Sequence, residues 1–371
     1  MKKLLLLFPF LFLFTHSAHA SGGDCEVSPP VTVGAGVTCV KAASVFGNAE
    51  GTSSVLFSPT AGDQLIFFGY MCEFYGNVTE CNQGNDWAAS TAYSTANTCV
   101  SKGSNSSGSG SGSARSSCIQ PVLNNPCNYA FAAQNSGTSG STEPNPWSTK
   151  PCQSSPATVS DGGITWIAIT LSIQDQNGTV ISCFTWSPNS PVELQVPPGV
   201  TASYLNWAAY CPSAPAGITS IQLVPSVATA AQASIMVQAY TGLCSTGTCI
   251  DKDGYGSSAT NTVNTVTASL SGPTSYNNEL LVALNGTVND EPLLPISPCF
   301  NIDPGSTEHA VDSNSVTGQI VTSAGTTPSC GVTWTGAADE GGILVMAVKM
   351  AGVSSQIPDP PTDLTASVTA P

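Results

Sequence analysis

Positively charged residues are scarce in this sequence. Its 371 residues include 8 Lys and Arg against 23 Asp and Glu, which gives a formal net charge of −15, and only 8% of the residues are charged. A nucleic-acid-binding protein needs a basic face, and so few cations cannot build one. We therefore expect no nucleic-acid partner. The acidic balance is typical of a surface that stays soluble and repels other polyanions.

Signals for helices are also missing. A coiled coil or helical bundle needs many Glu, Lys, Arg and Leu residues, and no stretch shows a sustained helical period with capping residues. Short runs rich in Val, Ile, Thr, Phe, Tyr and Trp, bounded by Gly, Pro, Asn and Ser, occur instead. Clear examples are 31–40, 64–74, 164–173, 233–240 and 342–349. This pattern predicts an all-β protein, specifically a jelly-roll-like antiparallel β-sandwich.

The first 20 residues are typical of a signal peptide. Lys2 and Lys3 precede an apolar run over 4–14 that is too short to span a bilayer comfortably, and Ala18-His19-Ala20 is a small-x-small cleavage site. No second apolar stretch is long enough for a transmembrane helix. We therefore expect cleavage after Ala20 and a secreted or cell-surface protein with no transmembrane anchor in this chain.

The 14 cysteines indicate an oxidising compartment, and their even number allows up to seven disulfides. Zinc binding is the competing interpretation, but no CxxC motif occurs and His309 is the only histidine beyond the signal peptide. Connectivity does not follow from spacing alone, so pairs that are close in sequence are the simplest expectation. These pairs are Cys25 with Cys39, Cys72 with Cys81, Cys183 with Cys211, Cys244 with Cys249 and Cys299 with Cys330.

Residues 75–160 interrupt the regular strand pattern. This stretch is rich in cysteine, and its segment 101–117 is almost pure Ser and Gly, which predicts a flexible loop. We interpret 75–160 as a disulfide-tied insertion within one β-sandwich of residues 21–350, with a small separate domain as the alternative. Residues 351–371 then form a Pro-containing linker and the tail of the chain.

Several segments resemble those of a known group of proteins. They recur, in this order, in bacterial secreted or cell-surface β-sandwich modules that often precede fibronectin type III repeats, and they are 62–67 (GDQLIF), 160–166 (SDGGITW), 237–242 (VQAYTG), 278–283 (NELLVA) and 342–349 (GILVMAVK). Residues 358–371, which contain PPTDLTA, resemble the start of a fibronectin type III domain. The resemblance implies a jelly-roll-like extracellular module and brings no catalytic residues with it.

Catalytic motifs are few. His309 is not accompanied by a GxSxG nucleophile motif, phosphate-binding glycine loops are absent, and oxidised cysteines cannot act as nucleophiles. The remaining enzymatic option is a pair of carboxylates acting on a glycosidic bond. Candidates for such a pair are Asp161, Glu193, Asp290, Glu291, Asp339 and Glu340.

Calcium is the one cofactor that the sequence suggests. Asp251-Lys252-Asp253-Gly254 places two carboxylates two residues apart before a glycine, which is how a Ca²⁺ loop begins. The alternative is a glycine-rich hairpin turn. Asp251 and Asp253 are therefore the candidate metal ligands.

Aromatic residues offer a possible carbohydrate-binding surface. Four of the six tryptophans lie in strand patterns and are expected in the core, whereas Trp87 and Trp147 lie in the insertion. Loops on a rigid scaffold often carry binding residues, so we expect Trp87 and Trp147 to bind a ligand. The expected function is non-enzymatic, namely adhesion or binding of a glycan, matrix component or surface protein. The alternatives are a polysaccharide-active hydrolase or lyase and a structural spacer of a larger surface protein.

Overall fold

The computed structural model shows an all-β protein, as the sequence predicts. The described part contains strands β1 to β30 and no helix, so it has no helical segment able to cross a membrane. The predictions for 1–20, 101–117 and 358–371 concern residues outside this part. The structure describes residues 31–34, 36–47, 53–72, 74–75, 78–81, 85–95, 98–99, 118–120, 131–147, 158–188, 190, 192–195, 203–226, 228–229, 232–258, 264–287, 293–302, 307–308, 313–335 and 341–352.

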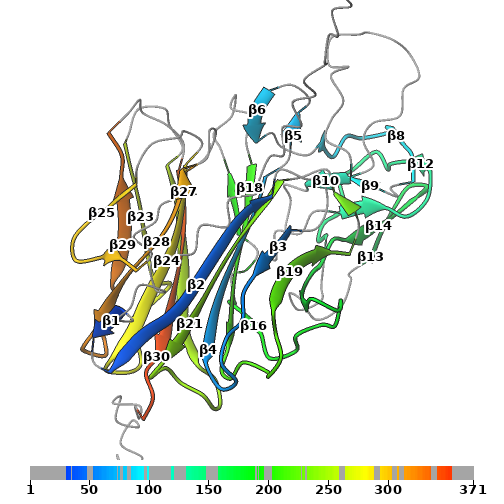
Figure 1. Ribbon diagram of the computed structural model, residues 1–371. Helices are drawn as coiled ribbons and strands as arrows, with labels where there is room; N and C mark the ends of the chain where they lie inside the picture. Colours follow the sequence, from blue (N-terminus) through cyan, green and yellow to red (C-terminus); the bar gives the residue numbers. More distant parts are fainter. Residues whose placement is uncertain are drawn as a thin grey trace, which may run out of the picture.

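Two large antiparallel sheets form the centre of the molecule (Figure 1). The first central sheet has the order β1 (Val31–Gly34), β2 (Val37–Gly47), β21 (Gln232–Thr241), β4 (Gln64–Cys72), β18 (Ser203–Cys211) and β16 (Thr185–Trp186), with β17 (Val192–Gln195) also paired to β18. The second central sheet has the order β22 (Ile250–Ser258), β30 (Gly341–Lys349), β24 (Glu279–Thr287), β28 (Ser313–Val321) and β26 (Phe300–Asn301), with β27 (Thr307–Glu308) also paired to β28.

A smaller sheet covers the outer face of each central sheet. The first outer sheet has the order β15 (Leu171–Asp175), β19 (Ser220–Pro225) and β3 (Ser53–Leu56). The second outer sheet has the order β23 (Thr265–Ser269), β29 (Ser329–Thr333) and β25 (Leu294–Pro295). Figure 1 shows the resulting four layers from β25 at the left to β19 at the right.

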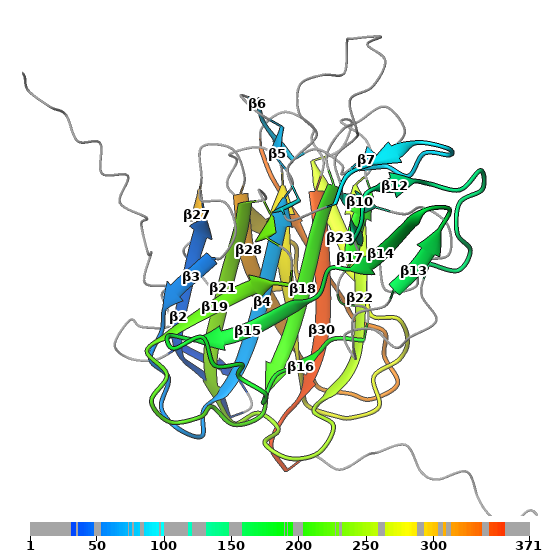
Figure 2. The same cartoon turned by 90° about the vertical axis from the view of Figure 1, so that its right-hand side faces the viewer.

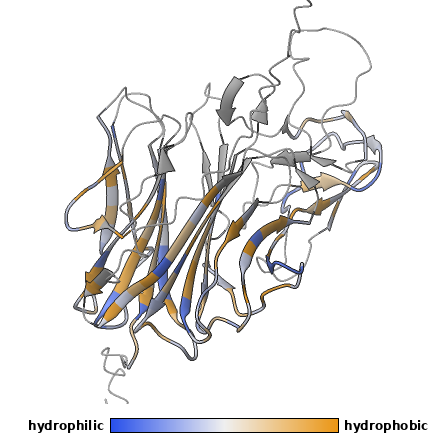
Figure 3. Cartoon of the chain, viewed as in Figure 1, coloured by the Kyte–Doolittle hydropathy of each residue, from blue (hydrophilic) through white to orange (hydrophobic). Residues whose placement is uncertain are grey.

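Three hydrophobic clusters fill the spaces between these layers. One lies between the two central sheets and includes Ile66, Tyr240, Val282 and Met346. The other two lie between each central sheet and its outer sheet. Both central sheets are therefore buried on both faces, and hydrophobic colour runs along their strands in Figure 3. Burial on both faces requires runs with no polar alternation, such as Leu280–Leu284.

The two halves of the stack have the same strand topology. The order β2, β21, β4, β18 in one central sheet is matched by β22, β30, β24, β28 in the other, and the outer strands correspond in the same way. Even an irregularity is shared, because the register shifts between Cys39 and Lys41 in β2 and between Ile250 and Lys252 in β22. The chain thus contains two repeats, a first repeat over 31–241 and a second repeat over 242–350.

The repeats pack through equivalent faces. At one edge of the interface, β1, which pairs with β2, contacts β28. At the other edge, β17, which pairs with β18, contacts β22. Since β22 is the equivalent of β2 and β28 is the equivalent of β18, the two contacts join the same pair of equivalent edges. Such reciprocal contacts are those of a two-fold interface. The sequence predicts one sandwich over 21–350, and the structure instead stacks two.

The insertion builds a small sheet of its own and extends to Ala168, beyond the predicted end at residue 160. Its strands lie beside the upper end of the first repeat (Figures 1 and 2), in the order β13 (Thr158–Asp161), β14 (Ile164–Ala168), β11 (Phe131–Ala133), β10 (Cys118–Gln120) and β7 (Asn85–Asp86). Short pairs accompany it: β8 (Ala92–Tyr93) with β12 (Gly137–Thr138), β5 (Phe74–Tyr75) with β6 (Val78–Cys81), and β9 (Thr98–Cys99) with β20 (Ala228–Thr229). The single strand predicted over 164–173 is therefore two strands, since β14 belongs to the insertion sheet and β15 to the first outer sheet.

Three disulfides are present in the described part. They join Cys183 to Cys211, Cys244 to Cys249 and Cys299 to Cys330, and these match three of the five predicted pairs. Cys39 is disulfide-bonded too. Its predicted partner Cys25, and the side chains of the predicted pair Cys72 and Cys81, lie outside the described residues.

Candidate functional site

Aromatic side chains form the core of the insertion. Tyr93 meets Trp166 edge to face with ring centroids 5.0 Å apart, and Phe131 lies 5.0 Å from Trp147. Trp147 in turn lies 6.2 Å from Trp166. All four rings are fully buried. A cluster of large aromatic rings supplies much buried area, so the insertion has a hydrophobic core separate from those of the two repeats.

Asp161 is the polar centre of the insertion. It ends β13, is buried, and its Oδ2 accepts hydrogen bonds from Trp87 Nε1 at 2.7 Å and from Trp166 Nε1 at 3.1 Å. Its Oδ1 accepts a third hydrogen bond, from the Gly140 amide at 2.7 Å. Hydrogen bonds to a charged acceptor are stronger than neutral ones. The carboxylate therefore fixes the orientation of Trp87 rather than facing a substrate.

The loop that carries Trp87 is held at several further points. The Ala88 amide donates to the Tyr93 hydroxyl at 3.0 Å, and the Ser139 hydroxyl donates to the Ala88 carbonyl at 2.6 Å. The Thr91 amide donates to Ser139 Oγ at 2.9 Å. These contacts anchor residues 87–91 to the insertion core and limit their freedom.

The two tryptophans predicted to bind a ligand have different environments. Trp147 is fully buried and its indole N–H donates to Glu143 at 3.0 Å, so its ring offers no surface to a ligand. This corrects the expectation for Trp147, which packs the insertion core. Trp87 packs against the same cluster but remains partly exposed. Only Trp87 keeps the surface that a ligand-binding aromatic residue needs.

The segment predicted as a calcium loop is not a loop. Residues 251–256 lie within β22, where 252–256 pair with β30 and Asp251 is the extra residue of a β-bulge. Asp251 and Asp253 accept hydrogen bonds from different parts of the protein, Ser275 and Ser187. Among the described residues, no group of three or more His, Cys, Asp or Glu side chains could hold a metal ion. The carboxylates therefore do not converge as a calcium loop requires.

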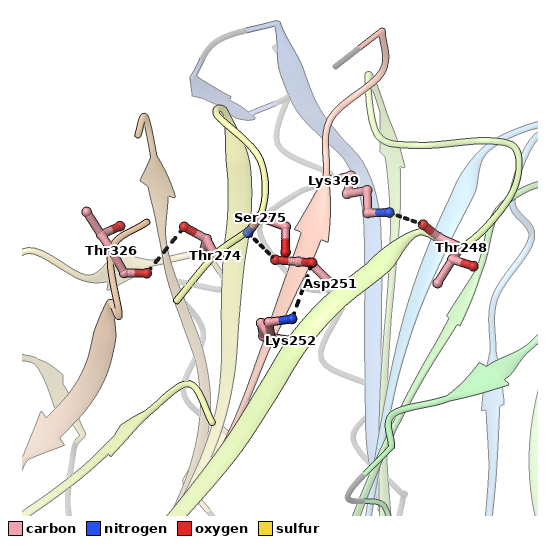
Figure 4. Close-up of polar contacts among 7 residues, drawn as sticks. All are labelled: Thr248, Asp251, Lys252, Thr274, Ser275, Thr326 and Lys349. Carbon is pink, nitrogen blue, oxygen red and sulfur yellow. Dashed lines mark hydrogen bonds and ion pairs between the residues drawn. The ribbon is translucent and has the colours of Figure 1, made fainter. Parts of the chain in front are cut away.

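Asp251 instead lies in a polar cluster at one end of the second repeat (Figure 4). Its Oδ2 accepts from the Ser275 amide at 2.7 Å, and its Oδ1 is 3.8 Å from Lys252 Nζ. On the neighbouring strand, Lys349 Nζ donates to the Thr248 carbonyl and lies 4.1 Å from the centroid of the Tyr276 ring. The cluster ties the loop 271–278 and the disulfide-closed turn 244–249 to the ends of β22 and β30.

Glu279 is the residue of this region that the sequence did not single out. It begins β24, pairs with Lys349 of β30 and is fully buried. Burial raises the pKa of Glu279 to about 8; the Asp251 carboxylate contributes to this rise, while Lys349 and Lys252 oppose it. A glutamate at the head of the apolar run LLVAL was the available signal, because such a residue enters the core with the strand.

The other predicted carboxylates and the histidine give no site within the described part. Asp161 is engaged as described above, and the side chain of Glu193 lies outside the described residues. The same holds for His309, Asp290, Glu291, Asp339 and Glu340.

Comparison of the chain with protein families, with curated proteins and with solved structures found no match.

Proposed function

We propose that this protein is a secreted or cell-surface module that binds an extracellular glycan through its insertion. The observation that carries the proposal is the state of Trp87. Its indole ring is partly exposed, and its orientation is fixed by the 2.7 Å hydrogen bond to Asp161.

A fixed aromatic ring suits carbohydrate recognition. An indole presents a rigid apolar face that can cover the C–H face of a sugar, and its N–H is already satisfied by Asp161. Fixing a side chain before binding lowers the entropy that the complex must lose. The hydrogen bonds that anchor residues 87–91 therefore favour binding at this place.

The surrounding scaffold supports the same role. Four stacked sheets with disulfides form a stable frame, and binding residues are commonly carried on segments that such a frame positions. The predicted signal peptide and the cysteine content support a location of this frame outside the cell. The acidic net charge of −15 disfavours polyanionic ligands, so a neutral glycan is the better candidate.

Hydrolysis is less well supported by the described residues. Among these residues, Glu279 is the carboxyl group whose pKa is raised, with Asp251 beside it, and Glu279 is fully buried. A polysaccharide chain could not place its glycosidic bond between them. A spacer role would not require an anchored, partly exposed tryptophan.

An array of neutral and acidic glycans, probed with the oxidised protein and assayed for released products, tests the proposal. We expect saturable binding to neutral glycans with no product. Released product would replace the proposal with a hydrolase or lyase. The absence of binding across a broad array would favour the structural spacer.

A further inference from the structure

Glu279 has no counterpart in the first repeat with the same environment. Cys39 pairs with Tyr240, which pairs with Gln64, while Ile250 pairs with Val348, which pairs with Leu280. Gln64 and Leu280 are therefore equivalent, and so are the residues before them, Asp63 and Glu279.

These two equivalent carboxyl groups differ in their hydrogen-bond partners. Asp63 accepts a hydrogen bond from the Thr60 amide at 2.9 Å and so closes a turn. Neither oxygen of Glu279, taken as the charged form, has a hydrogen-bond partner among the described residues, although the side chain is fully buried. The longer side chain reaches into the protein instead of bonding to its own turn.

The neighbours of Glu279 also differ between the repeats. The bulge residue of β22 is Asp251, where β2 has Val40, and Lys349 stands where the first repeat has Thr241. The groups that face Glu279 are thus Asp251 and Lys252 from β22 and Lys349 from β30. Val321, its partner on β28, carries no titratable group.

A charged Glu279 would be costly at this position. A buried carboxylate without hydrogen-bond donors loses its hydration without replacement, and a second carboxylate beside it adds repulsion. The neutral acid removes both penalties, because its O–H is a donor and the Asp251 carboxylate is an acceptor. A cation would need more oxygen ligands than two carboxylates supply, and Lys252 and Lys349 would repel it.

We propose that Glu279 is a neutral carboxylic acid in the folded protein at neutral pH, that it donates a hydrogen bond to Asp251, and that its ionisation at alkaline pH loosens the loop 271–278. The loop responds because Asp251 holds the Ser275 amide and Lys349 holds the Tyr276 ring. When Glu279 loses its proton to solvent, its charge repels Asp251 and attracts Lys349. Both contacts that hold the loop 271–278 are then weakened, so the Glu279–Asp251 pair makes the order of this loop depend on pH.

The direction of the pH effect follows from the raised pKa. Glu279 titrates near 8 in the folded protein and near its ordinary 4.5 in the unfolded chain. Between these values the folded state binds the extra proton, so this group's contribution to stability falls as pH rises from about 4.5 to about 8. Above about pH 8 neither state binds this proton, so the contribution of Glu279 to stability no longer changes with pH. Replacing the carboxyl with an uncharged amide removes this dependence.

The test compares wild type with Glu279→Gln and with the control Glu143→Gln across pH 4 to 10. The unfolding equilibrium constant of wild type should rise relative to that of Glu279→Gln by up to about tenfold per pH unit between about 4.5 and 8. Hydrogen exchange at residues 271–278, corrected for intrinsic rates, should accelerate in wild type above about pH 8 and not in Glu279→Gln. Identical pH profiles for wild type and Glu279→Gln would overturn the proposal.

A second measurement needs no glutamine variant and so remains informative if that variant does not fold. Infrared spectra of wild type should show a carboxylic acid band that persists at pH 7 and is lost at higher pH, with a midpoint near pH 8. In Asp251→Asn the midpoint should fall, because one negative neighbour is gone. The absence of this acid band in wild type at pH 7 would contradict the proposal. Slow hydrogen exchange of the loop 271–278 at pH 9 that returns when Ca²⁺ is added would also contradict it, because it would indicate a cation site.

Discussion

The Ser187 hydroxyl donates a hydrogen bond to Asp253 Oδ2 across the boundary between the two repeats. Ser187 follows β16 of the first repeat, and Asp253 lies on β22 of the second. Both side chains are buried. A buried carboxylate is stable only when donors replace its hydration, so this contact helps to fix how the central sheets pack.

Removing the hydroxyl should weaken the joint between the repeats. We expect Ser187→Ala to lower the free energy of unfolding by about 1–3 kcal/mol, because a buried charged acceptor loses a donor. Denaturant unfolding measures the loss. Ser269→Ala, at an exposed position of β23, is the control and should change stability by less than about 0.5 kcal/mol. Equal effects of the two variants would show that the contact contributes little.

The disulfides should differ in their stabilisation. Cys244–Cys249 spans a sequence separation of 5, whereas Cys299–Cys330 spans 31. If loop closure in the unfolded chain dominates, double Cys→Ala variants should lose about 2 kcal/mol for the short loop and about 4 kcal/mol for the long one. Chemical denaturation of both variants tests the order. A larger loss for the short loop would argue against loop closure as the main term.

Gly254 shows how closely the second central sheet approaches its outer sheet. A Cβ there would lie 2.1 Å from the Ser269 carbonyl oxygen, a backbone atom of β23. Gly254→Ala should therefore destabilise the protein by about 1–3 kcal/mol. Gly272→Ala is the matched control, because nothing lies within 4 Å of its added Cβ. Thermal melts that show the same small change in both variants would contradict the close packing.

The carboxylate of Asp161 should stabilise the insertion without affecting the stability of the two repeats. Asp161→Ala leaves two indole N–H groups and one amide without their acceptor, and we expect a loss of about 1.5–3 kcal/mol or more in local stability. Hydrogen exchange should increase over 131–147 and 158–168 while β24 and β30 keep their protection. Asp161→Asn, which retains an acceptor oxygen, should have a smaller effect. Loss of protection throughout the chain would show that the insertion and the repeats unfold together.

Local signals in the sequence predicted local structure well. Cysteines close in the chain, such as Cys244 and Cys249, are paired, and the β-rich runs at 64–74 and 342–349 form the central strands β4 and β30. The all-β class follows from the same runs. These features depend on neighbours in the chain, which a single sequence displays directly.

The duplicated stack was missed because its signal lies in the arrangement of strands. Equivalent inner positions carry different residues, for example Tyr240 in the first repeat and Val348 in the second. The unbroken apolar run Leu280–Leu284 was the clue, since a strand with one face in solvent would alternate. Covering both faces of two sheets requires four layers rather than the predicted two.

The candidate site was only partly predictable. Trp87 is partly exposed and Trp147 is fully buried, although both are tryptophans of the same insertion. The difference arises from packing between segments distant in sequence. The acidic pattern at Asp251 and Asp253 indicated a loop, but both residues lie in strand β22, which pairs with β30.

Glycan affinity of Trp87→Ala against that of wild type tests the central claim most directly. Tyr255→Ala is the matched control, because Tyr255 is 55% exposed and lies on β22 of the second repeat rather than in the insertion. The account predicts that Trp87→Ala loses at least about tenfold in affinity for the glycan that wild type binds, a change of about 1.4 kcal/mol, while Tyr255→Ala retains it. Unchanged binding by a folded Trp87→Ala variant would contradict the claim that the insertion recognises the ligand through this residue.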